Sequence, residues 1–225
     1  PSDVSYFTNP LDKWLISITE KLVLDVTLAF DDYDLSSSIP KMVNYIDLLN
    51  NWYIRRSRRR FWKSENDSDK IQAYTALYSA LKRFSLLFAP VVPFTTEAIW
   101  QNLKDDQDKM SIHLQDYSEY KENLRDEQLE FKMETVQKAI SMARNLRYQF
   151  NLKIRQPLKA VEIVTKNKKE QAVLREMEDS IIEELNVKEV IFHEREDEMV
   201  EYKAKANFKV LGKKLGKDMK EIARK

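Results

Sequence analysis

The chain has 225 residues, of which 43% are hydrophobic and 33% are charged, yet its formal net charge is only +1. This length suits one large domain, or a larger domain with a smaller one. Cysteine is absent, which excludes disulfides, thiolate nucleophiles and cysteine-based zinc sites and favours an intracellular protein. No run of about 18 apolar residues predicts a membrane span, and the beginning of the chain lacks a signal-peptide pattern.

Residues 1–105 are predicted to form four helices with short connections, the pattern of an antiparallel bundle. The first helix starts at Pro10 with Asn9 as its cap. One of its faces carries an apolar side chain at every fourth residue: Trp14, Ile18, Leu22 and Val26. The second helix is expected to start at about Ile39, which places Pro40 in its first turn.

The remaining helices follow from caps and apolar spacing. The third helix is expected to start behind a cap at residues 67–69, and the fourth behind Thr95 or Thr96. A polar loop with a short extended piece at 111–117 leads to a long helix at 126–149. One face of this long helix is apolar: Leu129, Met133, Val136, Ile140 and Ala143.

The character of the sequence changes after Pro157. Three segments rich in β-branched residues predict strands: 159–165, 187–194 and 199–206. An amphipathic helix at 168–185 lies between the first two strands, and the basic tail carries an apolar stripe typical of another helix. We therefore expect a mainly α fold, in which a helical domain at 1–156 precedes a small α+β unit at 157–225. Because no clear helix stop signal closes this unit, we expect the sequence to be a piece of a longer protein.

The most unusual stretch is NWYIRRSRRRFWK at residues 51–63, where five arginines and one lysine surround four aromatic rings without an acidic residue. Helical spacing at about 100° per residue continues the buried stripe of Met42 and Tyr53 onto Arg56 and Arg60. The other arginines and Trp62 then lie at the sides and back. A basic helix end is often simply solvated. Arginines interleaved with aromatic rings instead favour recognition of single-stranded RNA.

A second basic motif, ARNLRYQFNLKIRQPL, occupies residues 143–158. It places positive charges around an exposed turn, with Tyr148 and Phe150 nearby, so it could also contact phosphates. The alternative is an ordinary helix C-terminus that is favoured by basic residues and closed by Asn151. Spacing alone leaves both interpretations open.

The sequence gives little support for a catalytic site or a metal site. His113 and His193 are far apart and neither has a metal-ligand spacing. The carboxylates at residues 31–34 lack the glycine and glutamate of a calcium loop, so capping is the simpler interpretation. The sequence therefore predicts no active site.

Taken in order along the chain, several motifs resemble the anticodon-binding region of class I isoleucyl-tRNA synthetases. The motifs that carry this resemblance are NWYIRRSRRRFWKSE, the segment from DKIQAY to WQNL, SIHLQDY, ARNLRYQFNLKIRQPL, ELNVKEVIF and NFKVLGKKLGKDMKEIA. The Asn-Trp-Tyr triplet is shared with valyl and leucyl relatives, whereas RRSRRRFW and KIRQPL are typical of the isoleucyl enzymes. A valyl-type synthetase is the alternative within the family.

The resemblance implies that the bundle binds the anticodon stem and loop of isoleucine tRNA, while the α+β unit adds backbone contacts. The nucleic-acid-binding residues that it implies come from the two basic motifs: Trp52, Arg55, Arg56, Arg58, Arg59, Arg60, Trp62, Arg144, Arg147, Lys153, Arg155 and Gln156.

Several family features are missing from the sequence. The His-Ile-Gly-His type of ATP motif is absent, and Lys109-Met110-Ser111 continues with Ile112, unlike the family's Lys-Met-Ser-Lys-Ser loop. The editing domain and the cysteine-based zinc segment are also absent. The resemblance thus implies a parent ligase that uses ATP and magnesium in the cytoplasm. By itself this chain is expected to be catalytically inactive, to need no cofactor or metal, and to work beside the catalytic domain of the same polypeptide.

Two other classes of function remain open. In the first, the basic surface docks onto an acidic protein surface, and Arg56 and Arg60 pair with buried carboxylates inside the protein. In the second, the chain is a structural helical domain without a ligand. Competition by acidic polymers and salt-dependent binding to nucleic acid would distinguish these alternatives.

Overall fold

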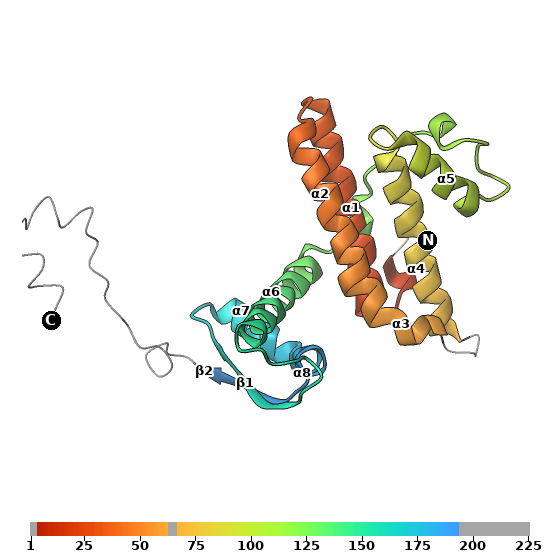
Figure 1. The fold of residues 1–225 in the computed structure, drawn as a ribbon. Helices are drawn as coiled ribbons and strands as arrows, with labels where there is room; N and C mark the ends of the chain where they lie inside the picture. Colours follow the sequence, from red (N-terminus) through yellow and green to blue (C-terminus); the bar gives the residue numbers. More distant parts are fainter. Residues whose placement is uncertain (1–3, 63–66, 194–225) are drawn as a thin grey trace, which may run out of the picture. The chain divides into compact units, whose positions relative to one another are not determined.

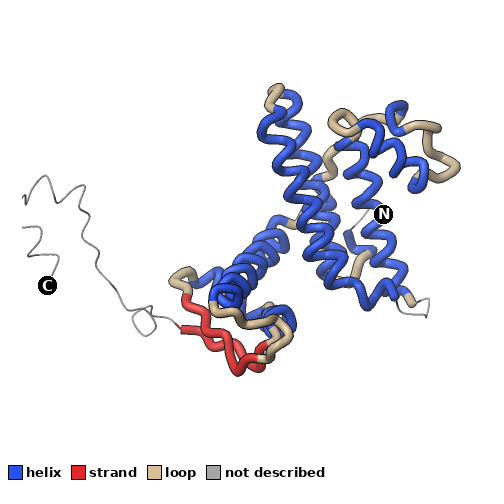
Figure 2. The backbone as a smooth tube through the Cα atoms, viewed as in Figure 1, coloured by secondary structure: helices blue, strands red, loops and turns tan. Residues whose placement is uncertain are grey.

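The computed structural model describes residues 4–62 and 67–193, and these form two compact units that divide between Gln137 and Lys138 (Figure 1). The first unit contains only helices and loops, whereas the second contains a small sheet as well (Figure 2). The two compact units divide within the long helix predicted at 126–149, and the domain boundary expected at residue 156 stays a prediction. The mainly α character of the chain is confirmed.

The first unit is built from helices joined by short connections. Their bounds are α1 (Pro10–Asp31), α2 (Leu35–Leu48), a π-helical turn (Leu49–Ile54), α3 (Arg55–Trp62), α4 (Ser68–Phe88) and α5 (Pro93–Leu103). Short 3₁₀ turns occur at Val4–Tyr6, Ile112–Leu114 and Glu122–Leu124. Together α2, the π turn and α3 form the single second helix that the sequence predicted.

The capping residues explain which of the predicted helix starts are correct and which are wrong. Asn9 accepts a hydrogen bond from the Leu11 amide, and Asp67 caps α4 in the same way. The second helix starts earlier than expected because Asp34 caps α2. Pro40 consequently lies inside α2 and not in its first turn.

The fourth helix also starts earlier than predicted, at Pro93, because proline suits the first helical position. Glu97 then lies one turn further in, where its carboxylate accepts hydrogen bonds from the Ser111 hydroxyl and the Ile112 amide. The sequence predicted an extended piece at 111–117. These contacts instead hold Ile112–Leu114 in a 3₁₀ turn.

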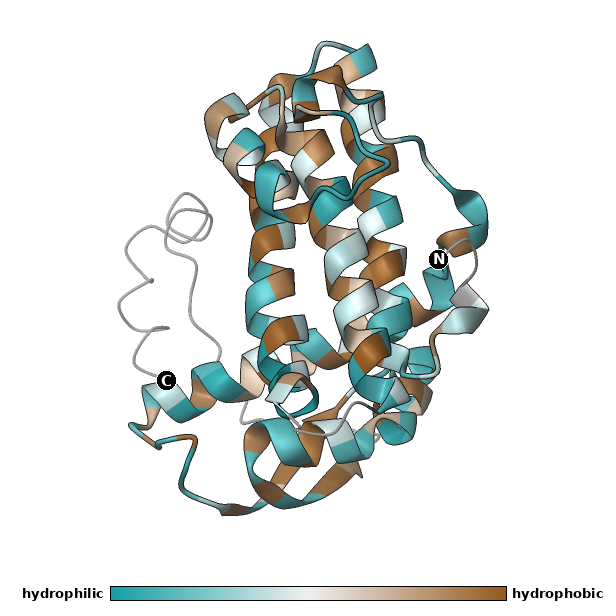
Figure 3. Ribbon diagram, turned by 90° about the vertical axis from the view of Figure 1, so that its right-hand side faces the viewer, coloured by the Kyte–Doolittle hydropathy of each residue, from teal (hydrophilic) through white to brown (hydrophobic). Residues whose placement is uncertain are grey.

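The core of the first unit surrounds α1, which packs against both α2 and α4. Apolar and polar residues alternate around the helices, as amphipathic helices require (Figure 3). The predicted stripe of α1 is buried throughout: Trp14, Ile18, Leu22 and Val26. A hydrogen bond of 2.6 Å joins the hydroxyls of Thr19 and Tyr45, and the Tyr45 ring stacks on Phe84.

Helix α6 (Glu127–Gln149) matches the predicted long helix, and its second half belongs to the second unit. The rest of that unit comprises β1 (Leu158–Val164), α7 (Lys168–Glu176), α8 (Glu178–Leu185) and β2 (Val187–His193). The two strands are parallel, so α7 and α8 form the connection that parallel pairing requires. The predicted strand at 199–206 and the basic tail at 203–225 lie outside the described residues.

Helices in the described part of the chain lack the combination of length and apolar character that crossing a membrane requires.

Candidate nucleic-acid interface

Helix α3 separates its side chains into an outer and an inner face. Arg55, Arg58, Arg59 and Trp62 are all exposed, and their spacing of three and four residues places them on one side of the helix. On the opposite side, Ser57 is fully buried. This outer face, residues 55, 58, 59 and 62, agrees with the predicted orientation of these side chains.

The outer face presents positive charge together with an aromatic ring. The Arg58 guanidinium lies over the Trp62 ring, 4.2 Å from its centroid, while Trp62 is still 68% exposed. The Nε of Arg55 donates a hydrogen bond of 2.8 Å to the Asn51 carbonyl, which steadies that side chain. Arg59 has no ion pair with any residue that the structure describes. Such a face can supply bidentate donors to phosphates and a surface on which a base can stack.

Arg60 points to the inner side and holds two carboxylates. Its guanidinium makes two hydrogen bonds to Asp12, at 2.8 and 2.7 Å, and its Nε donates to both oxygens of Asp69. Asp12 is completely buried, and its Oδ1 also accepts a 2.7 Å hydrogen bond from the Tyr53 hydroxyl. Arg60 therefore joins α3 to α1 and α4, and its donors are occupied within the protein.

This buried network shifts the protonation of its members. Burial, together with the charge of Asp12, raises the pKa of the Tyr53 phenol. Burial opposes the charge of Arg60, but its hydrogen bonds to Asp12 and Asp69 raise its pKa further. Arg60 is consequently a permanent cation that anchors the helix.

The π turn at Leu49–Ile54 supports the first half of the motif. Trp52 is only 6% exposed, so its ring is not accessible to a base. It instead serves as a platform for Arg56, whose guanidinium lies 4.8 Å from the ring centroid. π turns inside helices often occur at functional sites.

The second basic motif lies in the second unit, and two of its arginines are also used internally. Arg144 forms an ion pair with Glu184. Arg147 is 6% exposed and donates to the carbonyls of Lys153, Gln156 and Leu185 at 3.0, 3.0 and 2.7 Å. These contacts enclose Arg147, whereas the Arg144 side chain pairs with Glu184 and is still 39% exposed.

The other residues of this motif remain on the surface: Lys153, Arg155 and Gln156 are exposed. The predicted set thus divides by environment. Outward side chains belong to the outer face of α3 and to the loop after α6, whereas Trp52, Arg60 and Arg147 are enclosed by protein.

Sequence reasoning did not identify Asp12 and Asp69 as the partners of Arg60. Asp12 lies in the first turn of α1, where an acidic residue suits the helix N-terminus without further function. Its pairing with Arg60 spans 48 positions, so only the fold reveals it. Pairing of Arg60 with a buried carboxylate was one of the alternatives that the sequence left open.

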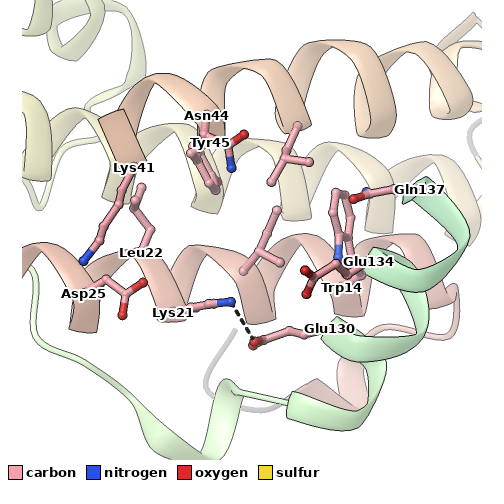
Figure 4. A pocket seen from close by; sticks show the side chains of 12 residues that line it. Trp14, Lys21, Leu22, Asp25, Lys41, Asn44, Tyr45, Glu130, Glu134 and Gln137 are labelled. Carbon is pink, nitrogen blue, oxygen red and sulfur yellow. Dashed lines mark ion pairs between the residues drawn. The ribbon is translucent and has the colours of Figure 1, made fainter. Parts of the chain in front are cut away.

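A cavity of about 360 Å³ lies between α1, α2 and the beginning of α6 (Figure 4). Its wall carries both signs of charge, with Lys21 and Lys41 facing Asp25, Glu130 and Glu134. The ammonium of Lys21 lies 4.0 Å from a carboxylate oxygen of Glu130. This balanced wall does not provide the excess positive charge that phosphates require.

A larger cavity of about 550 Å³ is bordered by α1, α4 and the loop at 115–121. Glu20 is fully buried at its edge and accepts 2.9 Å hydrogen bonds from Arg83 and from the Lys121 amide. Burial raises the pKa of the Glu20 carboxyl, although Arg83 and Lys121 act in the opposite direction. One carboxylate oxygen, Oε1, has no hydrogen-bond partner among the described residues.

This raised pKa predicts a pH effect on stability. Folding favours the protonated form of Glu20. The contribution of this group to the free energy of unfolding is therefore fully present below about pH 4.5, and it is lost as the pH rises through the folded-state pKa. The free energy of unfolding of the wild type, minus that of Glu20→Gln, should therefore decrease between pH 4 and 7. Urea titrations at several pH values would measure it, and a difference that grows with pH would contradict the assignment.

The described residues contain no group of three or more histidine and acidic side chains able to hold a metal ion. His193 instead contacts the Glu162 carboxylate at 2.9 Å, and Asp34 acts as the cap of α2. The interface therefore consists of cations and rings, without a metal centre in the described part of the chain.

Comparison with known proteins agrees with this arrangement. A family model described as the anticodon-binding domain of tRNA ligase matches residues 12–163, from α1 to β1. The match covers more than half of the chain. The chain belongs to this family of anticodon-binding domains.

Individual relatives are more specific. An isoleucine–tRNA ligase of Treponema denticola is 74% identical over 96% of this chain, and one of Treponema pallidum is 58% identical over 97%. An isoleucine–tRNA ligase of Protochlamydia amoebophila is 46% identical over 93%. The chain spans only about 20% of the length of each of these relatives. The resemblance to isoleucyl-tRNA synthetases is thus confirmed, for the region that this chain represents.

Proposed function

We propose that this chain binds the anticodon stem and loop of isoleucine tRNA, as the anticodon-binding part of an isoleucine–tRNA ligase. In that role it positions the tRNA in the cytoplasm for aminoacylation by a catalytic domain of the same polypeptide. The family membership and the relatives support the class of ligand. ATP and magnesium would act in the catalytic domain, since the motifs that bind ATP in this family are absent from the sequence.

The observation that carries the proposal is the outer face of α3. Three exposed arginines and an exposed tryptophan occupy one helix face, and no acidic residue occurs between Asp47 and Glu65. Unstacked loop bases need both a ring surface and hydrogen-bond donors, and this face supplies both. An acidic protein surface could also use these charges and the Trp62 ring, so competition between tRNA and an acidic polymer distinguishes the two kinds of partner.

The proposal is tested by titrating the chain with isoleucine tRNA and with the same tRNA carrying a changed anticodon, at two salt concentrations. The native anticodon should bind more tightly at both salts. Replacing Arg58 and Arg59 together with alanine should weaken binding of the native tRNA by about 1–3 kcal/mol for each base contact that is lost. Arginines that contact only phosphate should instead weaken both tRNAs equally and flatten the salt dependence.

The matched control removes the same charge elsewhere, by replacing Lys168 and Lys169, exposed on α7, with alanine. This variant should bind both tRNAs as the wild type does. The proposal fails if the Arg58 and Arg59 variant is also indistinguishable from wild type, or if an acidic polymer such as polyglutamate competes as well as tRNA. In the latter case the basic surface would be a protein-docking surface.

A further inference from the structure

The turn that closes α6 displays two aromatic rings to solvent. Tyr148 is 83% exposed and Phe150 is 71% exposed, although they lie only two residues apart. Single exposed rings are common, but two neighbouring rings at one turn leave apolar surface that a partner could cover. Neither ring belongs to the set of residues that the sequence assigned to nucleic acid.

The backbone of this turn is fixed by its own hydrogen bonds. Asn151 adopts a left-handed conformation, with φ of 54°. The Leu152 amide donates to the Arg147 carbonyl at 2.8 Å, and the Asn151 amide donates to the Tyr148 carbonyl at 3.1 Å. This is a Schellman-type helix end, which asparagine can adopt at little cost. The two rings are therefore attached to an ordered backbone.

The loop that follows is held from inside the second unit. The Arg147 guanidinium binds the carbonyls of Lys153 and Gln156, while the Asn186 side chain donates to the carbonyls of Ile154 and Arg155 at 3.2 and 3.1 Å. The backbone of residues 153–156 is thus anchored from one side. The side chains of Lys153 and Arg155 remain exposed.

The sequence on both sides of the turn carries charge of a single sign. No aspartate or glutamate occurs between Glu134 and Glu162, while this interval contains six Lys or Arg residues. The buried Glu184 approaches from α8, but its carboxylate is engaged by Arg144. An ordered, positively charged loop with two exposed rings has the composition of a binding site for single-stranded nucleic acid.

We propose that Tyr148 and Phe150 stack on unpaired nucleotides of the RNA, with Lys153 and Arg155 contacting the adjoining phosphates. This inference rests on the proposed function and deepens it, because it adds two stacking rings to the second basic motif. Arg147 is then a positioning residue that fixes the loop, while Arg144 joins α6 to Glu184 of α8. RNA is favoured over a protein partner because exposed lysine is depleted in protein interfaces, whereas both lysine and arginine neutralise phosphates. An ordered loop also avoids the entropy cost of folding on binding.

The test uses the 225-residue chain and an isoleucine tRNA transcript with 2-aminopurine placed in turn at each anticodon-loop position. Tyr148→Ala and Phe150→Ala should each reduce affinity by about fivefold to a hundredfold, and abolish the fluorescence change at one loop position. Because no charge is lost, the salt dependence should keep its slope. Tyr148→Phe and Phe150→Tyr keep a ring and should bind like the wild type.

Two controls match these variants in exposure but not in charge environment. Tyr33, 92% exposed, is flanked by Asp32 and Asp34, and Phe94, 91% exposed, is on α5. Tyr33→Ala and Phe94→Ala should leave RNA binding unchanged. Lys153→Ala combined with Arg155→Ala should weaken binding and lower the salt slope.

The stacking proposal is overturned if Tyr148→Ala and Phe150→Ala, shown to be folded by circular dichroism, bind the transcript like the wild type. If the Arg58 and Arg59 variant still loses affinity in the same assay, only this inference fails and the proposed function stands. If neither set of variants changes binding, both fail. An equal loss in the ring variants and in the Tyr33 and Phe94 controls would also overturn it, because the effect would then be nonspecific.

Discussion

Arg60→Ala is expected to destabilise the first unit by about 3–5 kcal/mol, because it leaves the fully buried Asp12 carboxylate without its counter-ion. The substitution also removes the link from α3 to Asp69 on α4. All four tryptophans of the chain lie within residues 1–137. Urea unfolding followed by tryptophan fluorescence therefore reports on the first unit specifically.

A second substitution separates the cost of an unpaired charge from the loss of packing. Combining Arg60→Ala with Asp12→Ala removes the stranded carboxylate, and the Tyr53 hydroxyl can still donate to the Ala73 carbonyl, which lies 3.1 Å away. The double variant should consequently be more stable than Arg60→Ala alone. If Arg60→Ala costs less than about 1 kcal/mol, or if the double variant is less stable than the single one, then this ion pair is not what holds α3 in place.

The two groups of arginines on α3 illustrate how one sequence motif can serve two purposes. An arginine whose charge is satisfied inside the protein fixes the helix, and the orientation of the exposed arginines depends on it. The same division occurs in the second basic motif, where Arg147 fixes the backbone and Arg155 remains exposed. Arginine suits both tasks, because its five donors can bind several acceptors at fixed angles.

The helices were largely predictable from the sequence because their apolar spacing and caps are local signals. The predicted start of α6 at residue 126 differs by one position from the observed helix. The π turn at Leu49–Ile54 was not predictable, since uniform rotation of 100° per residue was assumed across it. It contributes to the burial of Ser57, which the predicted stripe did not include.

Long-range pairings were less accessible to sequence reasoning. The orientation of β1 and β2 depends on how α7 and α8 return the chain, which the strand patterns alone do not specify. Likewise, the sequence could not show that Arg147 is buried while Arg155 is exposed, because burial of an arginine depends on acceptors from distant segments. Arg147 meets carbonyls of Leu185 and Asn186, which are close to it only in the folded unit.

Arg147→Ala is expected to destabilise the second unit by about 3 kcal/mol. The guanidinium supplies hydrogen bonds to four carbonyl oxygens, those of Lys153, Gln156, Leu185 and Asn186. Alanine would leave these oxygens without this donor in a region where Arg147 itself is buried. Because the second unit contains no tryptophan, amide hydrogen exchange of β1 and β2 is the suitable measurement.

Two comparisons identify the cause of this loss. Arg147→Lys keeps the charge but not the forked donors, so it should recover only part of the stability. Arg155→Ala removes an exposed arginine eight positions away and should change stability by less than about 0.5 kcal/mol. If the amide hydrogens of β1 and β2 exchange at the same rate in the Arg147→Ala and Arg155→Ala variants, the four carbonyls are not held in place by Arg147. The exposed rings of Tyr148 and Phe150 would then lack the ordered support that stacking requires.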